Sequence, residues 1–203
     1  PAGHLVPALR HGHRAVVARH RVLVLRDLRP RAAAAVGGLQ GRRALGFVPQ
    51  QDGSALTLPI TAREFVALGL CDLPISRREA NARADEALAK MSMEQNAHRR
   101  IDEMSLGQRR RALVARALAR RRHLLVLDEP TANLDPETAE QLAVDLDVLR
   151  CETGMCIVHA SHDLWLAERF ATHTARIAGD RLVLHEGAPK DGDFAAPRRG
   201  GQS

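Results

Sequence analysis

Runs of apolar residues that lead directly into polar residues mark two strands of this chain. Residues 124–128, LLVLD, place four apolar residues directly before Asp128 and Glu129. An apolar run of this length, closed by Pro130, is typical of a strand buried on both faces of a parallel sheet. The stretch 154–163, GMCIVHASHD, has the same form. Since open α/β sheets bind ligands at the carboxyl ends of their strands, we expect a site there.

Shorter patterns predict the other strands. The sequence LGFVPQQ predicts a strand over residues 46–48 that leads to Gln50, and RVLVLRDL at 21–28 alternates enough to predict a strand near the N-terminus. The segments 174–177 and 181–185, joined by a Gly-Asp turn, predict a hairpin.

Polar residues at helix starts predict four helices. Thr61 with Glu64, and Ser76 with Glu79, have the spacing of capping boxes. One face of the second helix is apolar: Ala80, Ala84, Ala87 and Met91. These two helices predict a small helical lobe. Another helix is expected to open at Ser105-Leu106-Gly107-Gln108. A fourth is expected after Asp135, where Pro136 and an early acid follow the N-cap.

The composition indicates a cellular compartment and shows that the charge is unevenly distributed along the chain. The chain has 203 residues, 45% of them hydrophobic and 2% aromatic, which suits one domain with an aliphatic core and an inserted lobe. Its net charge is +6, but residues 1–45 carry nine arginines against the single acid Asp27. Three cysteines without C-x-x-C spacing indicate reduced thiols in a cytosolic protein. No run approaches the ~20 apolar residues that span a bilayer.

Polar residues end or open four separate elements: Gln50, Ser105 to Gln108, Asp128 with Glu129, and His162. Two ionisable groups at the tip of an apolar strand are costly unless the site uses them. A hydrated Mg²⁺ held through Asp128, with Glu129 polarising a water, is the use that fits best. A helix start offers backbone N–H groups to an anion.

In this order and spacing, the set resembles the ATP-binding subunit of ABC transporters over residues 45–187. VPQ resembles the Q-loop, in which Gln50 would sense the γ-phosphate and Mg²⁺. LLVLDEP resembles Walker B, with Asp128 for Mg²⁺ and Glu129 as general base. SHD resembles the H-loop, in which His162 would contact the γ-phosphate and orient the attacking water.

Two further motifs imply a second subunit. MSLGQ resembles the LSGGQ signature, so Ser105, Gly107 and Gln108 would complete the nucleotide site of the partner subunit. ANLD resembles the D-loop, with Asp135 at the dimer interface. The resemblance implies ATP and Mg²⁺ as cofactors, and a transmembrane permease and a second ATP-binding subunit as partners. It places the protein peripherally on the cytoplasmic face of the membrane.

The implied fold is an α/β, P-loop-NTPase-like parallel sheet core with an inserted helical subdomain. We expect residues 1–45 to form an atypical Arg-rich segment, 46–187 the ATPase domain with the helical subdomain at about 52–118, and 188–203 a disordered tail. The phrase LPITAREFVALGL most resembles importers of zinc- or manganese-type metal ions.

The chain departs from the family pattern at its start. The Walker A loop, G-x-x-x-x-G-K-[ST], is absent, and no lysine precedes Lys90. Ala2-Gly3 could end such a loop, but His4 then stands where the lysine belongs, and Gly37-Gly38 does not replace it. Leu106 replaces the first glycine of the signature.

Three explanations of this departure stay open. Residues 1–45 are unrelated sequence from a truncated or disrupted copy, or the chain is a degenerate subunit that lends its signature to a competent partner, or it uses an unfamiliar phosphate loop. A nucleic-acid-binding protein is a further alternative because of the arginines near the start. The scarcity of aromatics for base stacking counts against it, and no nucleic acid is expected.

Overall fold

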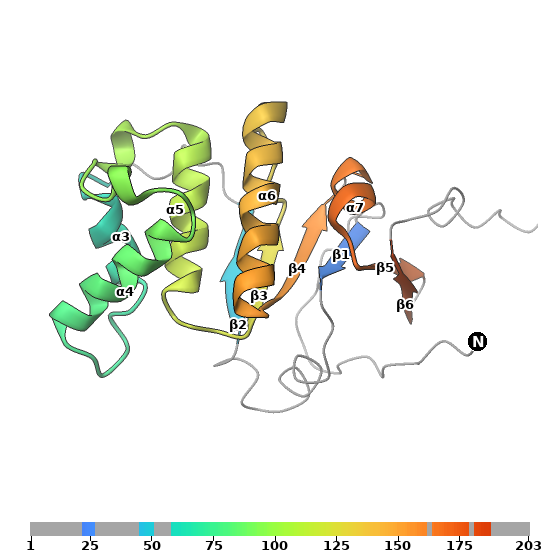
Figure 1. Cartoon of the computed structure of the whole chain (residues 1–203), viewed down its shortest axis with the longest axis horizontal. Coiled ribbons are helices and arrows are strands. Elements are labelled where there is room, and N and C mark those ends of the chain that lie inside the picture. Colours follow the sequence, from blue (N-terminus) through green and yellow to red (C-terminus); the bar gives the residue numbers. More distant parts are fainter. Residues whose placement is uncertain (1–21, 27–44, 51–57, 162–163, 179–180, 188–203) are drawn as a thin grey trace, which may run out of the picture.

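The computed structural model describes residues 22–26, 45–50, 58–161, 164–178 and 181–187 (Figure 1). Within these ranges one sheet has the strand order β2-β3-β4-β1-β5-β6. The strands are β1 (Val22–Arg26), β2 (Leu45–Val48), β3 (Leu124–Asp128), β4 (Cys156–Ser161), β5 (His173–Ala178) and β6 (Arg181–Glu186).

The parallel core consists of β2, β3 and β4. Val48 pairs with Leu127, and Asp128 pairs with Ala160, so the three strands end at the same edge of the sheet. This confirms the parallel arrangement predicted from the apolar runs.

Strand β1 extends this core in the opposite direction. It lies between β4 and β5 and is antiparallel to both, with Val22 opposite Ser161 and Arg26 opposite Ile157. Its amino end therefore lies at the edge where β3 and β4 end. The alternating pattern predicted the strand correctly but contains no information on its direction. The expected hairpin forms β5 and β6, which pair antiparallel.

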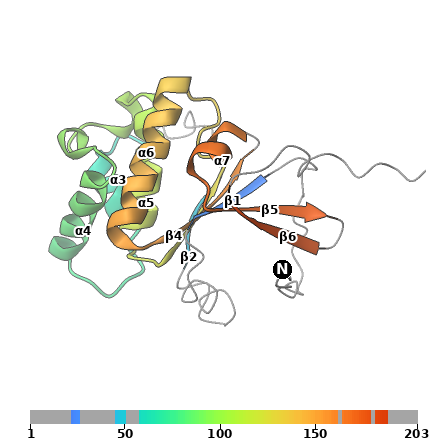
Figure 2. The same cartoon turned by 45° about the vertical axis from the view of Figure 1, so that its right-hand side comes forward.

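The helices are α3 (Ala62–Leu68), α4 (Arg77–Ala89), α5 (Leu106–Leu118), α6 (Pro136–Thr153) and α7 (Leu164–Phe170), with short 3-10 turns at Glu94–Asn96 and Ile101–Glu103. Helices α3, α4 and α5 pack on one another at one side of the molecule, as Figures 1 and 2 show. Helix α5 also contacts β2, α6 contacts β4, and α7 contacts β1.

The capping predictions are confirmed for α3 and α6. For α4, one of the two hydrogen bonds of the predicted capping box forms and the other does not. Thr61 and Glu64 form both bonds of a capping box, and Asp135 caps α6. Ser76 accepts a bond from the Glu79 N–H at 3.1 Å, but the Glu79 carboxylate pairs with Arg83 one turn later. A charged donor at i+4 thus takes the carboxylate that would have completed the second box.

The main core joins the helical cluster to one face of the sheet. Its fully buried side chains include Phe65, Leu88, Leu125, Leu127 and Ile157. On the opposite face, the described residues form a small cluster around Leu124 and Cys156. On β2, at the edge of the sheet, Phe47 is 55% exposed. The two faces therefore differ in how completely the described residues cover them.

The three cysteines are free thiols, as expected; Cys71 and Cys151 are exposed and Cys156 is buried. Among the helices that the structure describes, none is long and apolar enough to cross a membrane. The expected tail at 188–203 and the glycines at 3 and 37–38 lie outside the described residues.

Candidate functional site

The carboxyl edge of the parallel core collects three of the predicted site residues. Val48 pairs with Leu127, so Gln50 follows β2 beside the point where Asp128 and Glu129 follow from β3. Gln50 is exposed, Asp128 is half-buried, and Glu129 is 1% exposed. The edge thus combines an accessible amide and carboxylate with a buried second carboxylate.

The backbone at Glu129 has an unusual conformation. Its φ is 49°, in the left-handed region, which costs a residue with a side chain roughly 1–3 kcal/mol. Its N–H donates to the Ala160 carbonyl at 2.9 Å, and its carbonyl accepts from the Ala132 N–H at 3.2 Å. The Arg110 guanidinium donates to the same carbonyl at 3.3 Å. These bonds fix the direction in which the Glu129 side chain leaves the strand.

Arg110 connects three of the motifs. It extends from α5, is 3% exposed, and also donates to the carbonyl of Pro49 at 3.5 Å. One buried guanidinium therefore links the peptide before Gln50, the peptide of Glu129 and the helix that begins after Ser105. Sequence reasoning missed this role. The sequence did contain one indication of it, the run of three arginines at 109–111. Three consecutive residues cannot all lie on the solvent face of a helix with 3.6 residues per turn, so one of these arginines had to turn inward.

The start of α5 forms a complete capping box. Ser105 accepts from the Gln108 N–H at 3.2 Å, and the Gln108 side chain accepts from the Ser105 N–H at 3.1 Å. Gly107 is buried against Thr138 of α6, and a Cβ at this glycine would overlap the Thr138 methyl group. Only glycine therefore permits the observed approach of α5 to the first turn of α6.

Asp135 lies at the start of α6 and accepts a bond from the Thr138 N–H at 2.9 Å. The Thr138 hydroxyl group first, and this backbone bond second, lower the pKa of the Asp135 carboxyl group, because both stabilise its charged form. Gly107 and Asp135 thus meet at the same residue, Thr138. The structure joins the predicted signature and D-loop segments within one chain.

One predicted site residue cannot be placed. His162 lies outside the described residues, although Ser161 before it ends β4 at the same edge as Asp128. The structure therefore gathers Gln50, Asp128 and Glu129 and links them to α5 through Arg110.

The oxygen groups at this edge fit a hydrated Mg²⁺. Asp128 and Gln50 offer a carboxylate and an amide oxygen from neighbouring strand ends. Within the described ranges no three His, Cys, Asp or Glu residues cluster as a metal site. Mg²⁺ suits such an edge, because it usually binds through one or two carboxylates together with phosphate oxygens and waters.

Comparisons with known proteins agree on one family. The model of the ABC transporter family matches residues 37–132. The chain is 42% identical over 147 residues to the cobalt import ATP-binding protein CbiO of Rhodobacter capsulatus, covering 72% of this chain and 51% of the relative. It is 35% identical to the zinc import ATP-binding protein ZnuC of Ruegeria pomeroyi, covering 78% and 56%. It is 38% identical to the lipoprotein-releasing system ATP-binding protein LolD of Chromohalobacter salexigens, covering 66% and 55%.

Solved structures give the same answer for the fold. The cbiO1 structure from Clostridium perfringens, part of the cbiONQ transporter complex, superposes with a TM-score of 0.65 at 26% identity, covering 72% of this chain and 58% of that one. The ATP-binding cassette MJ0796, a dimer bound to ADP and Pi, superposes with a TM-score of 0.54 at 33% identity, covering 72% and 62%.

The chain spans about half the length of the curated relatives it matches: 51%, 56% and 55% for the three named. The family match at residues 37–132 contains the strands β2 and β3, the helical cluster, and Asp128 and Glu129. The sequence match, the superposed sheet and this edge together show that the chain belongs to the ABC transporter family, among its ATP-binding proteins.

Proposed function

We propose that this chain acts as the ATP-binding subunit of a transporter and couples ATP binding and hydrolysis to transport. The observation that carries this proposal is the carboxyl edge of the sheet, where Arg110 ties the peptides of Pro49 and Glu129 to α5. Phosphoryl transfer depends on positioning and charge stabilisation, so a rigid edge of this kind suits it.

Each residue of the edge has a proposed role. Asp128 and Gln50 hold Mg²⁺, which neutralises charge on the nucleotide phosphates when bound. Glu129 acts as general base toward the attacking water. The burial of Glu129 and the hydrogen bonds of its peptide group fix the direction in which its side chain points. His162 contacts the γ-phosphate.

The second half of the proposed site comes from a partner subunit. Ser105, Gly107 and Gln108 complete the nucleotide site of that partner, and Asp135 lies at the interface between the two. The exposed N-cap residue Ser105 supports this arrangement, because a helix N-terminus attracts phosphate oxygens. The relative MJ0796 was solved as a dimer with ADP and Pi.

The transported solute is proposed to be a metal ion, and the membrane partner a permease that holds this subunit on the cytoplasmic face. The cobalt and zinc import relatives support this assignment. The lipoprotein-releasing relative has a comparable similarity, and its name gives another solute class. We propose that the permease, rather than this chain, selects the solute.

A second function is supported by the position of Lys90. It is the one lysine within the described residues, and it lies at the end of α4, bound to Glu86. It is therefore remote from Asp128, and no described lysine serves the phosphates. In this second function the chain lends Ser105 to a competent partner subunit without turnover of its own.

Calorimetry of Mg-ATP binding to the purified chain tests the first proposal. We expect micromolar binding that Asp128→Asn weakens at least tenfold and that the exposed control Glu94→Gln leaves unchanged. Absence of binding at millimolar ATP would contradict ATP use by this chain. ATPase activity that rises on mixing with a competent family member, and only with Ser105 intact, would then establish the second function.

A further inference from the structure

A buried ion pair joins α5 to α6. Arg111 of α5 contacts Asp145 of α6, with Nη2 and Oδ2 3.1 Å apart, and the two side chains are 17% and 8% exposed. Gln141, one turn earlier on α6, donates from its side-chain amide to Oδ1 of Asp145 at 3.2 Å. A pair of charges therefore lies inside the contact between the two helices that begin at the predicted signature and D-loop segments.

The pair continues a line of contacts that runs from the starts of both helices. Gly107 lies one turn before Arg111 on α5, and Thr138 lies two turns before Asp145 on α6. Residues four and seven positions apart share one face of a helix, so the close contact of Gly107 with Thr138 leads directly to the ion pair. Both helices run away from the carboxyl edge in the same direction. Along α5, Arg111 lies about 9 Å from Ser105.

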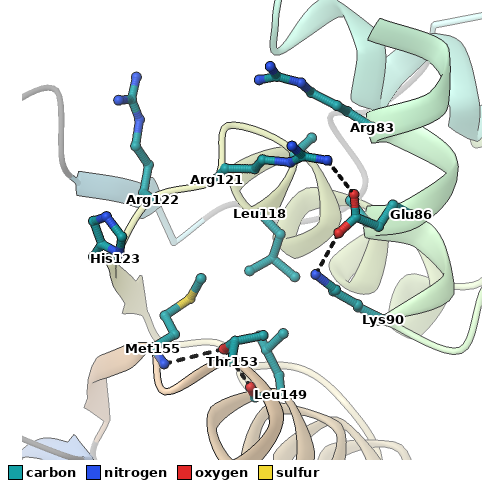
Figure 3. A pocket seen from close by; sticks show the side chains of 12 residues that line it. Arg83, Glu86, Lys90, Leu118, Arg121, Arg122, His123, Leu149, Thr153 and Met155 are labelled. Carbon is teal, nitrogen blue, oxygen red and sulfur yellow. Dashed lines mark hydrogen bonds and ion pairs between the residues drawn. The ribbon is translucent and has the colours of Figure 1, made fainter. Parts of the chain in front are cut away.

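A cavity lies at the other ends of these two helices. Its volume is about 200 Å³, and Leu118 of α5 and Leu149 of α6 line it from two sides (Figure 3). The residues that precede β3 and β4 also line it, which marks this as the amino end of the parallel core: His123 and Met155. Its ion pair between Glu86 and Arg121 joins α4 to the turn after α5. The Arg111–Asp145 pair thus lies between the close contact at Gly107 and this cavity.

The geometry of the pair favours a role in position over a role in stability. The attraction between two buried charges offsets the loss of their hydration only where further hydrogen bonds satisfy the remaining groups. In the described part of the chain, the buried Nε of Arg111 has no hydrogen-bond partner. An apolar pair of similar volume would therefore be at least as stable at this place.

One register of the two helices brings both charges together. One turn further along, the side chains are apolar and buried, with Val114 on α5 0% exposed and Leu149 on α6 2% exposed. A shift of α5 by one turn, about 5.4 Å, in one direction would place Arg111 against Leu149. A shift in the other direction would place Asp145 against Val114. Either shift leaves a buried charge without a partner, which is how polar groups fix register between helices.

We propose that Arg111, Asp145 and Gln141 are positioning residues that fix how the start of α5 lies against the start of α6. The proposal rests on the proposed function, in which Ser105 completes the site of a partner subunit and Asp135 lies at the interface. Such a site needs its groups held to within about 0.5 Å. A shift of α5 would carry Ser105 with it, because one helix joins that residue to Arg111.

Paired replacements in the full chain test the coupling. Arg111→Met or Asp145→Leu alone leaves one buried charge, so each should lower the midpoint of urea unfolding by at least about 1 M. The two replacements together remove both charges, so the midpoint should return to that of the wild type or rise above it. Arg63→Met with Asp85→Leu is the matched control, since it removes a partly exposed ion pair between α3 and α4.

A distance measurement then separates position from stability. The Gly107 α-protons and the Thr138 methyl group are in close contact, so a strong nuclear Overhauser effect should join them in the wild type. In the double variant of Arg111 and Asp145 this signal should fall at least threefold although the midpoint has recovered, and in the control it should stay unchanged. An unchanged signal in that double variant, single variants as stable as the wild type, or additive losses of stability would overturn the proposal.

Activity in a mixture with a competent family member separates this proposal from the proposed function. Where the wild-type chain raises the ATPase activity of that partner, the double variant of Arg111 and Asp145 should lower kcat at least tenfold and leave KM for ATP unchanged. The partner binds the nucleotide with its own residues, and the displaced Ser105 affects turnover. Equal stimulation by the double variant would overturn the positioning role. Absence of stimulation by the wild type would contradict the proposed function alone, since the unfolding and distance measurements need no nucleotide.

Discussion

The two ends of the parallel core hold their charged groups in different ways. At the carboxyl end, the buried Arg110 bonds to backbone carbonyls, and the buried Glu129 is fixed through its own peptide. At the amino end, charged side chains pair with one another. There the side chains of Glu86 and Arg121 are 44% and 61% exposed.

This difference predicts how each end tolerates change. A bond from a buried side chain to the backbone fixes the chain's path, and a buried carbonyl that loses its donor is costly. A pair of half-exposed side chains is screened by water and contributes little. The carboxyl end is therefore expected to be rigid and sensitive, and the amino end adaptable.

Arg110→Met should have the largest effect on stability. The change removes both donors to the carbonyls of Pro49 and Glu129, and hydrogen bonds of charged groups contribute about 1.5–3 kcal/mol. We expect a loss of about 3 kcal/mol in the free energy of unfolding, measured in urea. The exposed Arg78→Met is the control. A loss below about 0.5 kcal/mol would show that this guanidinium does not fix the edge.

Gly107→Ala should have the next largest effect. Its Cβ would overlap the Thr138 methyl group and force α5 away from α6, at a cost of about 1–3 kcal/mol that the better helix propensity of alanine partly offsets. We expect a net loss of about 1 kcal/mol in urea unfolding. Serine lacks that methyl group, so Thr138→Ser should restore most of the lost stability when it is combined with Gly107→Ala. If the loss in the double variant equals the sum of the losses in the two single variants, direct contact between these residues is contradicted.

The sequence predicted the parts of this edge that depend on local pattern. The apolar run before Asp128 predicted a buried strand, and Thr61, Ser105 and Asp135 marked helix starts, because capping depends on residues within three positions. The structure confirms each of these. The roles proposed for the site residues stay predictions.

The features that were missed depend on contacts between distant segments. Arg110 bonds to Pro49 across 61 positions, and no local pattern distinguishes it from its neighbours Arg109 and Arg111. The direction of β1 is set by pairing with β4, which the alternation of its side chains cannot encode. The second bond of the capping box predicted at Ser76 does not form, because the Glu79 carboxylate pairs with Arg83 instead.

Arg121→Gln should have little effect on stability at the amino end. It removes one of two partners of Glu86, and Lys90 remains bound to that carboxylate. We expect a change within about 0.5 kcal/mol in urea unfolding, since exposed ion pairs contribute about 0.2–1 kcal/mol. A loss comparable to that of Arg110→Met would remove the contrast between the two ends.

The smallest expected effect concerns the exposed pair of Asp72 and Arg120, beside the same end. Arg120 donates to both carboxylate oxygens of Asp72 at 2.7 Å, and these bonds lower the pKa of Asp72 from 3.8 to about 2. Because the pKa is lower in the folded chain, this contribution to stability is fully present above pH 3.8 and is lost as the pH falls toward 2.

Asp72→Asn should therefore unfold slightly more easily than the wild type at pH 5, and the difference should shrink as the pH approaches 2. Urea unfolding of both proteins across this range measures the difference directly, and other carboxylates that titrate there cancel. Added salt should reduce the difference at pH 5, because the pair is exposed to solvent. A difference that stays constant with pH would show that the pair does not form in solution, and the Glu86 pairs would then be the ion pairs left at this end among the described residues.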